Sequence, residues 1–159
     1  VTSVLFALSK TFNPVYGYKE LEAIFGDRRP ESAKELEEAV RAVRARKLPD
    51  PKVLPNAGSF FKNPVVTRTK MLHLLEETPS LVSYPLGGAR AKIAAGWLIE
   101  ACGLKGKRMG QAGVYERQAL ILVNYGGATG AEIKALAEEV ARNVKYRFGV
   151  ELEPEPVIL

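Results

Sequence analysis

The segment Leu48-Pro49-Asp50-Pro51 sets the firmest limit on how this chain folds. Proline has no amide hydrogen and restricts the residue before it, so a helix cannot continue through this segment. Upstream, Ser32 followed three residues later by Glu35 is typical of a helix N-terminus with a capping box. The apolar residues that follow have helical spacing: Leu36, Ala39, Val40 and Val43. We therefore expect an amphipathic helix that begins after Ser32 and ends at about Lys47.

The rest of the chain mixes helical and strand patterns without regular alternation. The expected strands are residues 1–8, 119–124 and 150–152. The further expected helices are residues 18–25, 67–77, 91–102 and a long one that begins after Thr129 and ends at Gly149. Thr129 and Glu132 form a second capping box. These patterns predict the α+β class, with a small antiparallel sheet packed against three or four helices.

Composition narrows the functional classes only a little. With 159 residues the chain is one domain, or one domain plus a piece of another. The net charge of +5 suits an anionic small ligand as well as a nucleic acid. Acidic residues interrupt the basic ones, which is typical of a solvated helix face. Nucleic-acid binding therefore rests on net charge alone, and a steep salt dependence of affinity would be its signature.

Other single residues point to an ordinary cytoplasmic protein. Cys102 is the only cysteine, so an internal disulfide is impossible and a reducing compartment fits. We find no signal peptide and no apolar run of membrane-spanning length, so we expect no membrane association. The single histidine, His73, has no partner of metal-binding type nearby, so no metal site is expected. The chain opens at Val1 as if within a strand, which looks like the later part of something longer.

The most informative segment runs from Asn56 to Pro64. It places the hydroxyl of Ser59 between Gly58 and the pair Phe60-Phe61. One interpretation is structural: the glycine turns the chain and the phenylalanines fill the core. The other is catalytic, because a hydroxyl beside water-excluding aromatic rings can donate a proton in a dry pocket. The local residues leave both interpretations open.

Three further positions carry polar groups that a ligand site can use. Glu155 lies between prolines near the C-terminus, where its charge either blocks unwanted strand pairing or takes part in catalysis. Lys47 at a helix C-terminus either complements the helix dipole or binds a phosphate. Gln118 precedes a buried strand and can place an amide in a pocket. Together these groups are suited to an anionic ligand and the transfer of one proton.

Four segments together resemble the UDP-N-acetylenolpyruvoylglucosamine reductase family, also called UDP-N-acetylmuramate dehydrogenases. The residues from Asn56 to Pro64 resemble the family's serine motif. The other three segments are Lys47–Lys52, Ala94–Gly106 with its AAGWLIE sequence, and Leu152–Glu155, which is similar to the C-terminal carboxylate motif. The order and spacing of the matches extend over nearly the whole chain.

The resemblance implies a flavoenzyme of peptidoglycan synthesis, and so of cell-wall biogenesis, cell shape and division. In that family NADPH reduces bound FAD. The reduced flavin then passes hydride to the enolpyruvyl group of UDP-N-acetylglucosamine enolpyruvate, which gives UDP-N-acetylmuramate. The carbon beside the substrate carboxylate must then receive a proton.

The resemblance also implies roles for individual residues. Ser59 matches the proton donor, and Glu155 matches the glutamate that assists at the enolate-like intermediate. Burial would favour a protonated Glu155. The expected contacts to the nucleotide diphosphate and sugar are Tyr18, Lys47, Asn63 and Gln118, with Tyr16 as the alternative to Tyr18.

The family places its glycine-rich FAD-binding portion and a catalytic arginine ahead of the position of Val1. The resemblance thus implies that residues 1–48 are the tail of the second lobe of the FAD-binding domain and residues 49–159 the substrate-binding domain. We expect this chain alone to bind FAD weakly or not at all, and its cofactor-binding residues stay unknown. The alternative function is that of a non-catalytic UDP-sugar-binding fragment.

Overall fold

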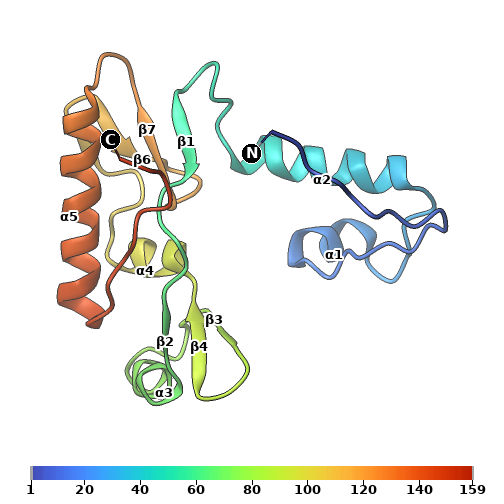
Figure 1. The fold of residues 1–159 in the computed structure, drawn as a ribbon, viewed down its shortest axis with the longest axis horizontal. Helices are drawn as coiled ribbons and strands as arrows, with labels where there is room; N and C mark the ends of the chain where they lie inside the picture. The colour runs from blue at the N-terminus through green and yellow to red at the C-terminus, as the bar shows by residue number, and fades with distance from the viewer. Residues whose placement is uncertain (1, 159) are drawn as a thin grey trace. The chain divides into compact units, whose positions relative to one another are not determined.

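The computed structural model describes residues 2–158 and divides into two compact units, which meet in sequence between Leu48 and Pro49 (Figure 1). The first unit contains two helices, α1 (Lys19–Phe25) and α2 (Ala33–Lys47), which pack against each other. The second unit contains three helices and two antiparallel sheets. The α+β class is therefore confirmed, with two small sheets in place of the one expected.

Helix α2 begins and ends where the sequence predicts. The hydroxyl of Ser32 accepts a hydrogen bond from the Glu35 amide at 3.2 Å, and Leu48 leaves the helix in an extended conformation. The expected capping box is incomplete, because the Glu35 carboxylate accepts from the amide of Glu31, at 2.7 Å. No residue of α2 is buried within this chain, although its apolar stripe is present.

The strand expected at residues 1–8 is absent over residues 2–8, and Val1 lies outside the described residues. The side chains of Leu5 and Phe6 are 99% and 73% exposed. A strand exists only where a neighbour satisfies its backbone amides and carbonyls. No such neighbour is found among residues 2–158, so the strand composition alone does not produce a strand.

The larger sheet of the second unit has the strand order β1-β7-β6-β5, and all its pairs are antiparallel. Helix α5 (Gly130–Phe148) packs against β6 and β7 (Figure 1). Thr129 and Glu132 complete the predicted capping box of α5, and Gly149 ends it in the left-handed region. The strands are β1 (Asn56–Ser59), β5 (Arg108–Met109), β6 (Ala112–Val114) and β7 (Ile121–Asn124).

The smaller sheet has the order β2-β4-β3 and packs with helix α3 (Figure 1). Helix α3 follows its N-cap Thr67 and confirms the prediction at that place. The elements are β2 (Val65–Thr67), α3 (Arg68–Glu77), β3 (Ser83–Pro85), β4 (Arg90–Ile93) and α4 (Ala95–Ala101).

Two predicted elements are wrong. The helix expected at residues 91–102 is split into β4 and the shorter α4, because Arg90–Ile93 alternates exposed and buried side chains and pairs with strands on both sides. The strand expected at residues 150–152 does not form. Beyond this segment, Pro154 pairs with Phe61 through one isolated antiparallel bridge.

The core of the second unit joins both sheets with α4 and α5. Its most deeply buried large side chains are Leu74, Ile93, Leu98, Ile99, Val114, Val123, Leu136, Val140 and Val144. Phe60 and Phe61 belong to the same cluster, and Trp97 packs on its edge. No helix within residues 2–158 combines the length and the apolar character needed to cross a bilayer.

Gly113 lies where a side chain has no room. A Cβ atom on this residue would lie 2.7 Å from a ring carbon of Tyr125 and 3.2 Å from the Lys107 carbonyl oxygen. The guanidinium of Arg108 is 3.5 Å from the centre of the same ring, on which it stacks. We expect Gly113→Ala to lower the free energy of unfolding by about 1–3 kcal/mol through overpacking, measured by urea denaturation.

Gly130→Ala is the matched control. Gly130 is the first residue of α5, and a Cβ there meets no atom within 4 Å. Alanine favours the helix over glycine by up to about 1 kcal/mol, so this variant should be as stable as the parent or more so. Equal unfolding midpoints for both variants would contradict the packing argument.

Candidate functional site

The segment from Ser59 to Lys62 is held on two sides by backbone hydrogen bonds. On one side, Ser59 pairs with Ile121 of β7, and the Phe60 amide donates to the Leu120 carbonyl at 2.8 Å. On the other side, the Glu155 amide donates to the Phe60 carbonyl at 2.8 Å, and the Lys62 amide donates to the Glu153 carbonyl at 2.9 Å. Three distant parts of the sequence therefore meet at this segment.

Gly58 and the two phenylalanines have the structural role that one interpretation predicted. Gly58 has φ of 75°, a left-handed value that favours glycine, and the β1–β7 register shifts between Asn56 and Ser59. The rings of Phe60 and Phe61 are buried and contact each other edge to face at 5.2 Å. This anchoring leaves Ser59 exposed at the surface. The structural interpretation therefore holds for three residues and leaves Ser59 available for chemistry.

Ser59 and Glu155 line one open depression of about 360 Å³, together with Ala57 and Pro156. A hydroxyl can donate a proton and a carboxylate can accept a hydrogen bond, so the pair contains the elements of a proton-transfer site. Glu155 is exposed, so residues 2–158 do not provide the burial that would favour its protonated form. Water exclusion at this face is therefore not a property of the chain by itself.

Lys62 and Glu153 form an ion pair, and both line a second open depression, of about 610 Å³. The two side chains are 50% and 71% exposed, so the pair contributes at most about 1 kcal/mol. The two residues also share the backbone hydrogen bond between 62 and 153. Sequence inspection identified both as polar residues but missed the pairing, because their separation in sequence carries no signal of contact.

Asn63 caps helix α4. Its side-chain oxygen accepts a hydrogen bond from the Ala95 amide at 2.9 Å. The helix begins after Ala94, which has no side chain able to cap it. Asn63 thus satisfies a backbone donor that the helix itself leaves free. Asn63 therefore has a structural role in addition to any contact that it makes with a ligand.

Gln118 reaches the same end of α4. Its side-chain oxygen accepts from the Leu120 amide at 3.4 Å. The same oxygen lies 3.2 Å from the position that a Cβ atom would take on Gly96. Asn63 and Gln118 therefore contact successive residues in the first turn of α4. The structure brings both to the second unit, which also holds Ser59 and Glu155.

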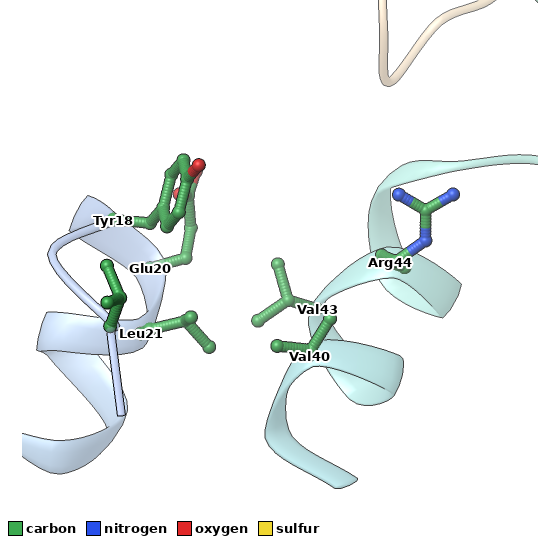
Figure 2. Close-up of a pocket in the computed structure, with 7 residues that line it drawn as sticks. Tyr18, Glu20, Leu21, Val40, Val43 and Arg44 are labelled. Carbon is green, nitrogen blue, oxygen red and sulfur yellow. The ribbon is translucent and has the colours of Figure 1, made fainter. Parts of the chain in front are cut away.

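Tyr18 belongs to the first unit, where it precedes α1. It is 69% exposed and lines an apolar depression of about 430 Å³. Figure 2 shows Tyr18 and Leu21 on the α1 side of this depression, opposite Val40 and Val43 of α2. The ring of Tyr16 instead packs edge to face on Phe25, with centroids 5.7 Å apart. Of the two tyrosines, Tyr18 is the one with its ring free for a ligand.

Lys47 lies in the last turn of α2 and pairs with Glu20 of α1. The hydrogen bond from the Lys47 ammonium lowers the pKa of the Glu20 carboxyl below its ordinary value. Because the pKa is lowered, the pair is present at neutral pH and is lost as the pH falls through that lowered pKa. Any anion that binds Lys47 must share the ammonium with Glu20.

The described residues contain no buried polar group that marks a flavin site. Among residues 2–158 no polar or charged side chain is buried, and no buried side-chain nitrogen or oxygen lacks a partner. A dinucleotide cofactor needs a cradle of inward-facing donors for its phosphates.

The family model and the relatives that match this chain carry the same enzyme name. The sequence model described as "UDP-N-acetylenolpyruvoylglucosamine reductase, C-terminal domain" matches residues 50–159. A protein named UDP-N-acetylenolpyruvoylglucosamine reductase from Paraburkholderia xenovorans is 53% identical over 163 residues, which cover 100% of this chain and 47% of that protein. The protein of the same name from Chromobacterium violaceum is 52% identical over 162 residues, with the same shares covered. The chain thus spans about half the length of these relatives.

A solved structure also resembles this chain. It is the crystal structure of UDP-N-acetylenolpyruvylglucosamine reductase from Thermus caldophilus, with a TM-score of 0.45 and 29% sequence identity. The alignment covers 81% of this chain and 36% of that one.

The capping contact of Asn63 predicts a stability effect that is separate from ligand binding. We expect Asn63→Ala to lower the free energy of unfolding by about 1 kcal/mol, because the Ala95 amide loses its acceptor. Asn63→Asp keeps an oxygen acceptor at that place and should retain most of the stability. Urea denaturation of the purified chain measures both. An alanine variant as stable as the parent would show that the cap is dispensable.

Proposed function

Because the chain belongs to the UDP-N-acetylenolpyruvoylglucosamine reductase family, we propose that it carries the substrate site and the proton donor of that reaction. The reaction is the reduction of UDP-N-acetylglucosamine enolpyruvate to UDP-N-acetylmuramate in cytoplasmic peptidoglycan synthesis. In this proposal FAD and NADPH supply the hydride, and the residues that hold them stay unassigned. The family relationship supports this oxidoreductase class.

One observation carries the proposal. Ser59 and Glu155 come from opposite ends of the second unit's sequence and yet line the same depression. The backbone hydrogen bonds of Phe60 and Lys62 to residues 153–155 bring them there. A serine and a glutamate beside one surface hollow are the groups that the proposed chemistry requires.

The reduction adds hydride to the terminal carbon of the enolpyruvyl group and a proton to the carbon that bears the carboxylate. We assign the proton to the hydroxyl of Ser59, whose exposure lets it recover a proton from solvent. Glu155 assists at the enolate-like intermediate. Such positioned proton donation is worth roughly a hundred- to ten-thousand-fold in rate.

The two amides act as donors to the substrate in this proposal. The side-chain oxygens of Asn63 and Gln118 accept from backbone amides at 2.9 and 3.4 Å. This leaves the NH₂ group of each side chain to donate to oxygens of the nucleotide diphosphate or sugar. Tyr18 and Lys47 belong to the first unit, and we propose them as ligand contacts on the family relationship alone.

The two units correspond in this proposal to two functional parts. Residues 1–48 are the tail of the second lobe of the FAD-binding domain, and residues 49–159 are the substrate-binding domain. A second candidate function is a UDP-sugar-binding fragment without catalysis. It is favoured by the exposure of Glu155, which residues 2–158 leave open to solvent.

The first test replaces the proton donor in a full-length reductase that contains this chain. Ser59→Ala should leave NADPH-dependent flavin reduction unchanged and lower product formation by roughly a hundred- to ten-thousand-fold. Ser59→Cys keeps an ionisable hydrogen and should retain more product formation than Ser59→Ala. Stopped-flow absorbance follows the flavin, and chromatography follows the product. Loss of both half-reactions in Ser59→Ala would point to a structural role instead.

The second test concerns the 159-residue chain alone. We expect the purified chain to carry no stoichiometric flavin and to oxidise no NADPH, because the family model that it matches is that of the C-terminal domain. Absorbance near the flavin bands and NADPH consumption measure this. A yellow protein that consumes NADPH would refute the expectation.

A further inference from the structure

Gly96 lies at the point where two amide side chains approach helix α4. It is the second residue of that helix, directly after Ala95, whose amide donates to Asn63. The side-chain oxygen of Gln118 lies 3.2 Å from where a Cβ atom on Gly96 would be. The absent side chain of Gly96 therefore leaves the space in which the Gln118 amide rests.

Leu120 closes the same space from the other side. Its Cγ atom also lies 3.2 Å from the Cβ position on Gly96, and its amide donates to the Gln118 oxygen. Contacts of this length are tighter than ordinary van der Waals contact, so a methyl group at residue 96 must displace Gln118 or Leu120. Leu120 is anchored because its carbonyl accepts from Phe60. The side chains of Gln118 and Leu120 must both give by a few tenths of an ångström, and the Gln118 amide then leaves its present place.

Helix geometry does not require glycine at this position. Gly96 has no positive φ, and alanine is preferred over glycine within a helix by about 1 kcal/mol. Glycine at residue 96 costs helix stability and needs no special backbone angle. The space that it leaves therefore explains its presence. That space is occupied by the side chain to which we assign a substrate contact.

We infer that Gly96 is a positioning residue that holds the Gln118 amide in place to bind the nucleotide sugar. This inference rests on the proposed function, since it takes Gln118 as a substrate contact. It gives helix α4 a part in substrate affinity. The effect should appear in substrate affinity and not in flavin reduction.

The test is a double-mutant cycle in a full-length reductase that contains this chain. Gln118→Ala should raise KM for UDP-N-acetylglucosamine enolpyruvate by about tenfold, the value of one lost hydrogen bond. Gly96→Ala should raise KM by several-fold, and the double variant should be no worse than Gln118→Ala alone. The rate of flavin reduction by NADPH, followed in Gly96→Ala, separates a local effect on the sugar site from a general loss of structure. Gly130→Ala, at an open helix position, should leave KM unaltered.

Each departure from this pattern has a distinct meaning. A normal KM in Gly96→Ala beside a raised KM in Gln118→Ala overturns the inference and leaves the proposed function intact. Multiplying effects in the double variant also overturn it, because they show that Gly96 acts without Gln118. A normal KM in Gln118→Ala removes the substrate contact itself, and with it both the inference and that part of the proposed function.

A further variant covers the case in which Gly96→Ala does not fold. Gln118→Asn keeps the amide but shortens the side chain, so the amide cannot reach the space beside Gly96 from its present backbone position. We expect its KM to rise as in Gln118→Ala. A KM equal to that of the parent would overturn the inference, because the place of the amide would then be immaterial.

Discussion

The backbone pairing of Phe60 and Lys62 with residues 153–155 is the contact on which the candidate site depends. It connects the end of β1 to the C-terminal segment, and Phe60 connects the same stretch to Leu120 beside β7. These are main-chain bonds, so they set the relative positions of Ser59 and Glu155 before any side chain is considered. The buried rings of Phe60 and Phe61 attach the whole arrangement to the core. Chemistry at the surface is thus supported by hydrophobic packing directly beneath it.

Several polar residues of the site serve the fold as well as the ligand. Asn63 caps α4 and Lys47 pairs with Glu20, although both are candidates for substrate contact. An amide or ammonium held by a structural bond has less rotamer freedom to lose when a ligand binds. Such a residue is harder to interpret by mutation, because its replacement changes stability and affinity together. Conservative variants that retain the structural acceptor are needed to separate the two.

Local signals in the sequence predicted the helices well and the strands poorly. Ser32 and the following proline segment placed α2, and Thr129 and Gly149 placed α5, because these signals act within one turn of helix. The strand expected at residues 1–8 did not appear over residues 2–8, because strand formation depends on a partner that local composition does not reveal. Strand β4 was missed although Arg90–Ile93 alternates, since its short length and apolar continuation into α4 imitate a helix. For the site, motif resemblance named Ser59 and Glu155, but only the three-dimensional structure shows them beside one depression.

The prolines on either side of Glu155 determine how the C-terminal segment can dock. Neither Pro154 nor Pro156 has an amide hydrogen, so among these three residues only Glu155 can donate to the Phe60 carbonyl. A slip of one residue in either direction would place a proline opposite that carbonyl and leave it without its donor. The alternation of proline and glutamate therefore disfavours a slip of one residue in either direction. In the observed register Glu155 and Ser59 line the same depression.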